Sequence, residues 1–232
     1  AAFGYPRGGD NVYLSHTVTV TDAAACANIT VVTGRVDILD SGQLDVFGNA
    51  SVNRGELTGQ GPVKLWRGSD NSWVFMGEAN LVSCPFFNEG DLAFVETPSL
   101  QLENRFFNGP TATVVGNCAD FTLYSTTGVG TVQNQGTFQV RNYGTCVVDR
   151  LEIQNGRLQL GTGSVLKTKG RFGTNYNGTY VVPTGAVFHP VLDGNAYYDG
   201  TFTSTGPGTW QLDDGVLDVG HVTSTTTVFD VG

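Results

Sequence analysis

Two adjacent carboxylates, Asp213 and Asp214, are the first residues to consider for catalysis, with His221 seven residues further on. A pair of carboxylates can act as general acid and general base in the cleavage of a glycosidic bond. The chain repeats a turn signal about every 20 residues, and seven residues is about a third of that period. These side chains therefore cannot stack as neighbours on one face, and Asp214-Gly215 is better explained as a turn.

Other catalytic and metal-binding patterns are weak. The basic cluster of Lys167, Lys169 and Arg171 alternates as a solvated strand face does. The chain has no Gly-x-Ser-x-Gly nucleophile sequence. The histidines have no partner at metal-ligand spacing: His16, His189 and His221. We predict no catalytic residue, no metal site and no cofactor, with a polysaccharide lyase or hydrolase as the alternative.

The cysteines are even in number and far apart in the sequence: Cys26, Cys84, Cys118 and Cys146. There is no C-x-x-C motif, so zinc and dithiol redox sites are disfavoured. An even number of cysteines is typical of disulfide-bonded extracellular proteins. We expect two disulfides, whose pairing the sequence does not determine, and four buried thiols are the alternative.

Three Asn-x-Ser/Thr triplets begin at Asn28, Asn49 and Asn177. Such triplets are acceptors for N-linked glycans in secreted proteins. The sequence starts at Ala1 without a Met or a charged leader, as a mature secreted protein or a trimmed chain would. Together with the cysteines, these features predict a glycosylated protein that is secreted or held at the cell surface.

A repeated element must position all of these residues. A short motif recurs along the chain. Asn or Asp is followed, directly or after one residue, by Gly, then by one further residue and a large apolar residue, as in Asn53-Arg-Gly55-Glu-Leu57 and Asn88-Glu-Gly90-Asp-Leu92. Later copies have their glycines 20, 22 and 22 residues apart, at Gly136, Gly156, Gly178 and Gly200. A turn signal at a fixed period predicts an all-β fold, a parallel β-solenoid with coils of about 20–22 residues.

Alternating polar and apolar residues predict the strands of each coil. In the segment 34–38, Val36 and Ile38 should face inward while Arg35 and Asp37 face solvent. The middle of the chain, roughly 60–130, is less regular and rich in aromatic residues, which could fill a wider cross-section. Because the repeat spans nearly everything, we predict a single solenoid domain over residues 1–232.

The net charge of the chain disfavours two classes of binding partner. The net charge is −9 and no basic run exists to neutralise phosphates, which disfavours nucleic acid and anionic membrane surfaces. No apolar run approaches the roughly 20 residues that a membrane span requires. We therefore expect neither a nucleic-acid partner nor a membrane span.

The opening segments carry a resemblance to a known group. They read Gly9-Asp10-Asn11-Val12, Thr17-Val-Thr-Val20, Gly34-Arg-Val-Asp-Ile38 and Gly42-Gln-Leu-Asp-Val46. With these segments the chain resembles the extracellular, adhesin-like members of the right-handed parallel β-helix proteins, over residues 9–60 and 130–220. The resemblance implies a surface or secreted β-helix with a structural or adhesive role.

We expect an extracellular structural solenoid. It would be a surface or matrix filament subunit joined end to end to copies of itself, or else an adhesive module that contacts surface glycans. A polysaccharide-binding or polysaccharide-cleaving β-helix is the alternative, since exposed rings can stack on sugars: Trp66, Trp73, Tyr197 and Tyr198 are the candidates. An ice-binding solenoid is a further alternative, because threonines recur 22 residues apart at Thr179, Thr201 and Thr223 and would form a ladder if that register held.

Overall fold

The structure is a computed structural model of the 232-residue chain. It describes residues 9–66, 72–77, 80–96, 99–117, 120–127, 130–141, 143–149, 152–169, 178–191, 195–212, 216–224 and 228–231. In these ranges short strands rich in β-branched residues alternate with glycine-containing and polar turns, the composition that favours strands and tight corners. No helix in this described part is long and apolar enough to cross a membrane.

The regular elements of the described residues are β-strands. In chain order they are β1 (Asn11–Leu14), β2 (Thr17–Val20), β3 (Ala23–Cys26), β4 (Asn28–Val32), β5 (Arg35–Ile38), β6 (Gln43–Val46), β7 (Ala50–Asn53), β8 (Glu56–Gly59), β9 (Val63–Leu65), β10 (Ser72–Met76), β11 (Asn80–Val82), β12 (Phe86–Asn88), β13 (Asp91–Val95), β14 (Ser99–Leu102), β15 (Arg105–Asn108), β16 (Thr113–Gly116), β17 (Asp120–Tyr124), β18 (Thr131–Val140), β19 (Thr145–Asp149), β20 (Glu152–Leu160), β21 (Val165–Lys169), β22 (Gly178–Val181), β23 (Val187–Val191), β24 (Asn195–Thr205), β25 (Thr209–Leu212), β26 (Val216–Ser224) and β27 (Val228–Val231).

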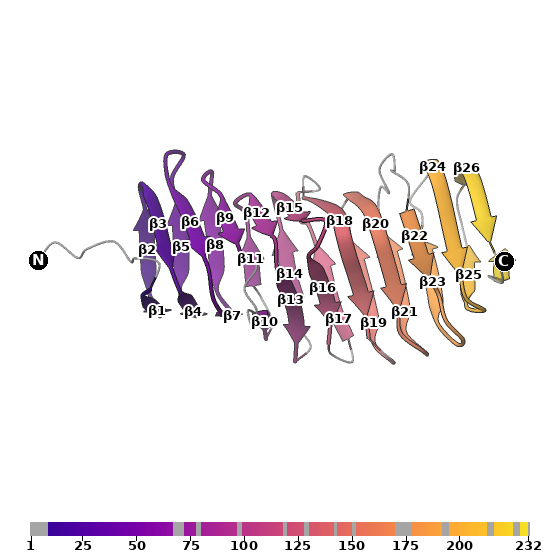
Figure 1. Ribbon diagram of the computed structural model, residues 1–232, viewed down its shortest axis with the longest axis horizontal. Helices are drawn as coiled ribbons and strands as arrows, with labels where there is room; N and C mark the ends of the chain where they lie inside the picture. The colour runs from indigo at the N-terminus through magenta and orange to yellow at the C-terminus, as the bar shows by residue number, and fades with distance from the viewer. Residues whose placement is uncertain are drawn as a thin grey trace, which may run out of the picture.

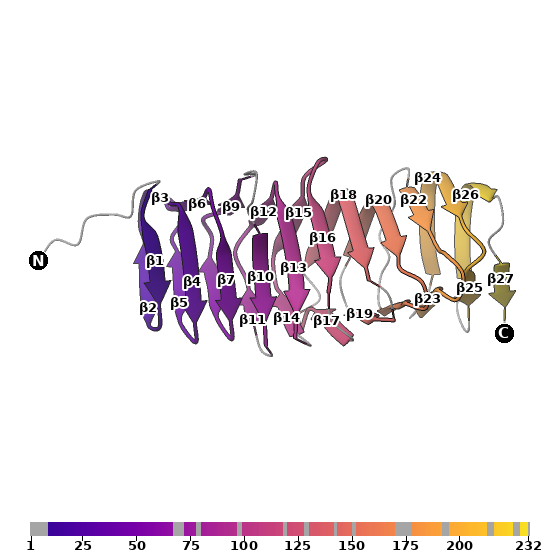
Figure 2. The ribbon, with the colours of Figure 1, turned by 60° about the horizontal axis from the view of Figure 1, so that its bottom comes forward.

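Each strand pairs in parallel with a strand of the next coil, so three rows of stacked strands run along one axis. We call them the first face (β1, β4, β7, β10, β13, β16), the second face (β2, β5, β8, β11, β14, β17, β19, β21, β23, β25, β27) and the third face (β3, β6, β9, β12, β15). Strand β18 joins the first and third faces, because its first half pairs with β15 and its second half with β16. The coils form a rod with β1 near one end and β27 near the other (Figure 1, Figure 2). This is the parallel β-solenoid that the repeat predicts.

Coil length varies more than the sequence indicates. Asn11 pairs with Asn28, which lies 17 positions further along the chain. Thr113 pairs with Thr137, which lies 24 positions further. The predicted 20–22 residues lie inside this range, because the turns differ in length and the pairing shifts register within β18–β20 and β24–β26.

The predicted threonine ladder is wrong in its register. The backbone of Thr203 pairs with Thr179 on one side and with Thr223 on the other, whereas Thr201 pairs with His221. The coil from Thr179 to Thr203 is 24 residues long, so a fixed 22-residue spacing places the wrong threonine in the row.

Inward-facing residues of each coil pack on those of the next. The predicted alternation in β5 is confirmed, since Val36 and Ile38 are buried while Arg35 is exposed and Asp37 is half-buried. A solenoid needs no central core, because each coil buries its apolar side against its neighbours. The buried side chains therefore form one continuous column along the rod.

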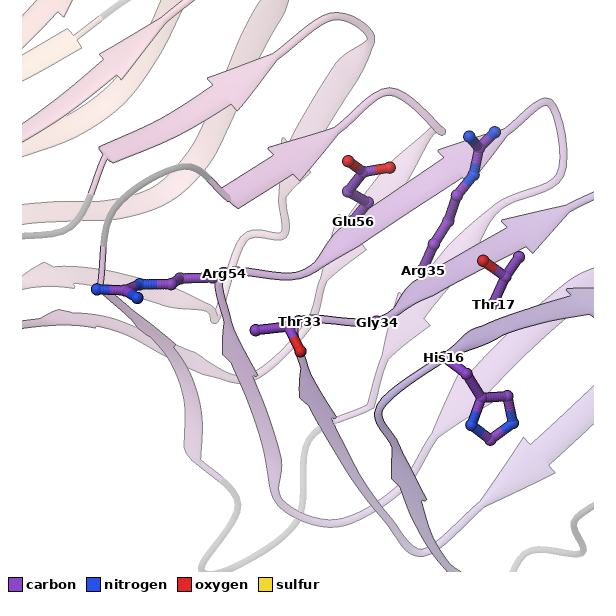
Figure 3. Close-up of a pocket in the computed structure, with 7 residues that line it drawn as sticks. All are labelled: His16, Thr17, Thr33, Gly34, Arg35, Arg54 and Glu56. Carbon is purple, nitrogen blue, oxygen red and sulfur yellow. The ribbon is translucent and has the colours of Figure 1, made fainter.

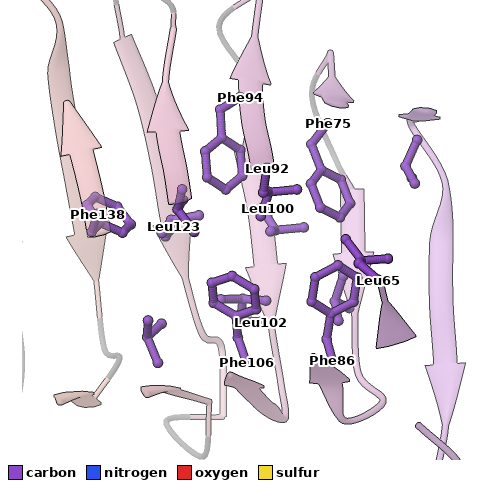
Figure 4. Packing of buried hydrophobic residues seen from close by; sticks show 14 of the residues in the cluster. Leu65, Phe75, Phe86, Leu92, Phe94, Leu100, Leu102, Phe106, Leu123 and Phe138 are labelled. Atoms are coloured by element: carbon purple, nitrogen blue, oxygen red, sulfur yellow. The ribbon is translucent and has the colours of Figure 1, made fainter. Parts of the chain in front are cut away.

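The aromatic residues of the middle coils divide between the inside and the outside of the rod. Phe75 and Phe94 stack inside with ring centroids 6.0 Å apart and planes inclined by 20° (Figure 4). Phe86 packs on Phe106 with centroids 5.4 Å apart. These rings fill the interior as predicted, but the alternation of the strand turns the neighbouring Phe87 out of the core.

Buried asparagines stack at the corner between the third and first faces. The side-chain amide of Asn88 donates to Oδ1 of Asn108 at 2.8 Å, and that of Asn108 donates to Oδ1 of Asn134 at 2.7 Å. The amide of Asn134 donates to the carbonyl oxygen of Arg157 at 3.1 Å. Each amide thus satisfies groups of the next coil, and this ladder fixes the corner in register.

The repeated Asn-x-Gly phrase marks two different corners rather than one. Asn53 ends β7 and Gly55 precedes β8, where the first face turns into the second. Asn88 ends β12 and Gly90 precedes β13, where the third face turns into the first. The sequence does not distinguish them, because both corners need the same short polar turn.

Candidate functional site

A polar groove of about 250 Å³ lies at the corner between the first and second faces. It spans three consecutive coils, where β1 turns into β2, β4 into β5 and β7 into β8. Figure 3 shows the side chains that line it, which are His16, Thr17, Thr33, Gly34, Arg35, Arg54 and Glu56. The groove is built from turn residues that the solenoid brings together from positions about 20 residues apart.

The corner depends on residues in the left-handed backbone conformation. Thr33 has φ 54° and Arg54 has φ 53°, and Glu96 takes φ 63° at the same corner of a later coil. Side chains with a Cβ rarely adopt this conformation. The next residue, Gly34, is needed because the backbones of adjacent coils lie close together: a Cβ on Gly34 would lie 3.0 Å from the carbonyl oxygen of His16. Gly77 takes φ 70° at the same corner of the coil between Arg54 and Glu96, so glycine and other residues share this conformation.

One charged side chain of the groove, Arg35, already interacts with other residues of the protein. The Nε of Arg35 donates to Oγ1 of Thr58 at 2.9 Å, and its guanidinium lies 3.6 Å from the carboxylate of Asp37. Figure 3 shows Arg54 and His16 on opposite sides of the groove, with the Arg35 and Glu56 side chains extending from the second face. The lining thus offers two guanidinium groups, one imidazole and one carboxylate.

This arrangement is suited to hydrogen bonding and charge pairing. Glu56 is the one carboxylate of the lining, so the groove does not itself hold the pair of carboxylates that glycoside cleavage uses. Among the described residues, no three histidine, cysteine or acidic side chains gather where they could hold a metal ion. The groove therefore presents hydrogen-bonding groups and charges of both signs, but no catalytic pair.

A second polar cluster surrounds the carboxylate of Glu103, which follows β14. One oxygen, Oε1, accepts from the backbone N–H of Thr126 at 2.6 Å, from its hydroxyl at 2.7 Å and from the Gln101 amide at 2.8 Å. The other, Oε2, accepts from the Ser125 hydroxyl at 2.8 Å, from the Thr127 N–H at 3.3 Å and from the Thr127 hydroxyl. Glu103 thereby ties one coil to the turn of the next.

These donors favour the charged form of Glu103. Burial opposes ionisation, but the hydroxyls of Thr127 and Thr126, the Thr126 N–H and the Gln101 amide outweigh it and hold the pKa of the carboxyl well below its usual range. Sequence reasoning missed this cluster, although Gln101-x-Glu103 and the run Ser125-Thr-Thr127 were visible. Only the stacking of coils shows that the two meet.

The predicted glycosylation sites differ in accessibility. The Asn28 amide donates to Oδ1 of Asn11 at 2.5 Å, and its Oδ1 accepts from the backbone N–H of Asn49 at 2.6 Å. Asn28 is therefore half-buried within the coil stack, whereas the side chain of Asn49 is exposed. Asn177 lies outside the described residues. Glycosylation at the three sites stays a prediction.

The structure contradicts the predicted pair of disulfides. Cys26, Cys84 and Cys146 are buried and none of them is in a disulfide, while Cys118 lies outside the described residues. The coil of Cys84 is three strand pairings from Cys26 and three from Cys146, which is about 14 Å along the rod. A disulfide requires Cα atoms within about 7 Å. Two bridges among four cysteines need at least one between these three, so the alternative of buried thiols holds for them.

Burial makes these thiols poor nucleophiles. It raises the pKa of Cys26 to about 11, with a smaller contribution from the charge of Asp10. It raises the pKa of Cys84 to about 12. The thiolate is the reactive form of cysteine, so both residues serve packing rather than chemistry.

Of the other residues considered for catalysis, the described ones are placed as follows. Asp213, Asp214 and Arg171 lie outside the described residues. Lys167 is exposed on the second face, where its backbone pairs with His189, as expected for a solvated strand. His16 is the one histidine that lines the groove.

The fold and these sites define the chain as a parallel β-solenoid. No protein-family model, curated protein or solved structure matches it significantly. The β-solenoid part of the resemblance is therefore confirmed, and its adhesin-like part stays a prediction.

Proposed function

We propose that the chain is an extracellular structural solenoid, a stiff rod that joins copies of itself end to end into a surface or matrix filament. The observation that carries this proposal is the series of parallel strand pairings, which runs from β2 to β27 on the second face and from β1 through β18, β20, β22 and β24 to β26 on the first. Such a row makes each coil a template for the next, since a parallel edge offers backbone N–H and C=O groups to any strand of matching register.

The coil of β1, β2 and β3 offers these edges. Among the described residues each of these strands pairs on one side, with β4, β5 and β6 respectively. The carbonyl of Asp10 accepts from the backbone N–H of Ala27 at 2.9 Å, so Asp10 faces β4. Successive backbone groups of a strand point to opposite sides, which directs the N–H groups of Asn11 and Tyr13 away from β4.

A contact between this edge and the far end of another copy is heterologous. A heterologous contact that does not close into a ring generates a filament. The Oδ1 of Asn11 at this edge accepts a hydrogen bond from the Asn28 amide, so a polar side chain of another copy could extend this pair across a junction.

Sedimentation velocity over a concentration series tests this assembly. The variant Tyr13→Pro removes an outward N–H, and the matched variant Tyr13→Ala removes the exposed ring and keeps the N–H. We expect sedimentation coefficients that rise with concentration for the native chain and for Tyr13→Ala, and a single small species for Tyr13→Pro. Equal assembly of the native chain and both variants, with unchanged circular dichroism, would show that the β1 edge is not the contact.

Glycans on the sides of the rod would keep neighbouring rods apart. Asn49 is the described acceptor whose side chain is exposed. Expression in a secreting eukaryotic cell should give a glycosidase-sensitive shift in mass that decreases in Asn49→Gln. A secreted chain that carries no glycan in such a cell would contradict this part of the proposal.

A further inference from the structure

The third face carries aromatic side chains on its outside. Phe47 and Trp66 follow β6 and β9 and are 47% and 42% exposed. The N–H of Phe47 donates to the carbonyl of Cys26 and that of Trp66 to the carbonyl of Val46, so the two residues occupy one row in successive coils. Their ring centroids lie 6.2 Å apart and their planes are inclined by 13°. The two rings are stacked on one another and form an apolar patch that is in part exposed to solvent.

A second pair of rings lies in the next two coils, two residues along the strand from the row of Phe47 and Trp66, which Glu89 continues. Phe87 pairs with Phe107 in register, and their ring centroids lie 5.8 Å apart. The guanidinium of Arg105 lies 5.9 Å from the centre of the Phe87 ring, a cation–π distance. Lys64 links the two pairs, because its backbone pairs with Asp45 on one side and with Phe87 on the other.

Hydrogen bonds fix the indole of Trp66 in place. Its Nε1–H donates to Oδ1 of Asp45 at 2.8 Å. The other oxygen of Asp45 accepts from the Gln43 amide at 2.6 Å. The ring edge is therefore satisfied by the protein and the orientation is set before any ligand arrives, which reduces the entropy cost of binding.

We propose that this aromatic strip, made of Phe47, Trp66, Phe87 and Phe107, binds an uncharged polysaccharide that lies along the rod axis. A sugar chain presents apolar C–H faces with a rim of hydroxyls, and it repeats in one direction as the coils do, at about 4.8 Å per strand. Flat rings beside amide, ammonium and guanidinium groups complement both parts of such a ligand.

The charges of the face select an uncharged ligand. Lys64 and Arg105 are balanced by Asp45 and Glu89, whose backbones lie in the same coils of this face. The chain as a whole carries a net charge of −9, which repels polyanions. A solenoid that assembles into a filament would repeat the strip along its length, but the binding does not depend on assembly.

Native electrophoresis in gels that contain a soluble polysaccharide tests this inference. The gels would contain a β-glucan, a xylan or a mannan, with a polygalacturonate gel as the acidic comparison. We expect at least one uncharged polymer to retard the protein, and an apparent affinity about ten-fold lower in Trp66→Ala. Trp66→Phe keeps a ring and should lose less. Tyr13→Ala is the matched control, because it removes an exposed ring from the first face.

Four outcomes would overturn the inference. The first two are that no uncharged polymer retards the protein and that polygalacturonate alone retards it. The third is that Trp66→Ala and the native chain are retarded equally. The fourth is a dimer that Trp66→Ala abolishes, which would make the strip a protein interface. Circular dichroism of each variant separates loss of binding from loss of fold. Because neither Trp66 nor Phe47 lies on the β1 edge, failure here leaves the filament proposal untouched.

Discussion

Replacing Asn108 by alanine should destabilise the solenoid by an amount that the buried ladder determines. Asn108 is completely buried, accepts from the Asn88 amide at 2.8 Å and donates to Asn134 at 2.7 Å. Truncation removes a partner from a buried donor and from a buried acceptor, and each such group costs about 1–3 kcal/mol when left unsatisfied. We therefore expect a loss of about 2–6 kcal/mol in the free energy of unfolding.

Urea unfolding followed by far-ultraviolet circular dichroism measures this loss. A loss of about 4 kcal/mol lowers the midpoint by roughly 2 M urea, for a slope of about 2 kcal/mol per molar. Asn117→Ala is the control, because Asn117 is exposed and should change stability by less than about 0.5 kcal/mol. Native-state hydrogen exchange should show faster exchange in the coils of β12 to β18, since repeat proteins lose stability locally. A midpoint for Asn108→Ala no lower than that of Asn117→Ala would refute the reasoning.

Three further predictions concern packing, charge and thiols. Gly116→Ala should destabilise by about 1–3 kcal/mol in the same urea assay, because its Cβ would lie 1.9 Å from Cε1 of Phe121, and an unchanged midpoint would contradict this close fit. Glu103→Gln should cost about 1 kcal/mol at pH 7, a figure reduced for solvent exposure. Because folding lowers the pKa of Glu103, its contribution to stability is complete above the ordinary pKa of 4.5 and is lost as the pH falls below that value. The stabilities of the native protein and Glu103→Gln should therefore converge in acid. A difference that stays constant with pH would argue against the cluster. Cys26 and Cys84 should react with a thiol reagent at pH 8 only after denaturant is added, and rapid labelling of the native chain would contradict their burial.

The period of the turn phrase was sufficient to predict the solenoid, because a fixed spacing of glycine and asparagine has few other structural explanations. It was insufficient for the register. Thr203, not Thr201, pairs with Thr179, since turn lengths vary from coil to coil. The disulfide prediction was wrong for another reason, because it rested on the even number of cysteines, which says nothing about where they lie along the rod.

The sites were less predictable than the fold. The phrase Phe86-Phe87 shows by alternation that one ring faces inward and one outward, but not which. The stacking of Phe47 on Trp66 joins residues 19 positions apart, and the Glu103 cluster joins residues more than 20 apart. Such contacts arise from the coil register, which the sequence alone does not supply.

Electron microscopy of the purified chain across a concentration series tests the central claim most directly. The account predicts straight filaments of uniform width that lengthen with concentration, in which the strand spacing of about 4.8 Å continues through each junction. Single rods at every concentration, or rods that associate only side by side, would contradict it.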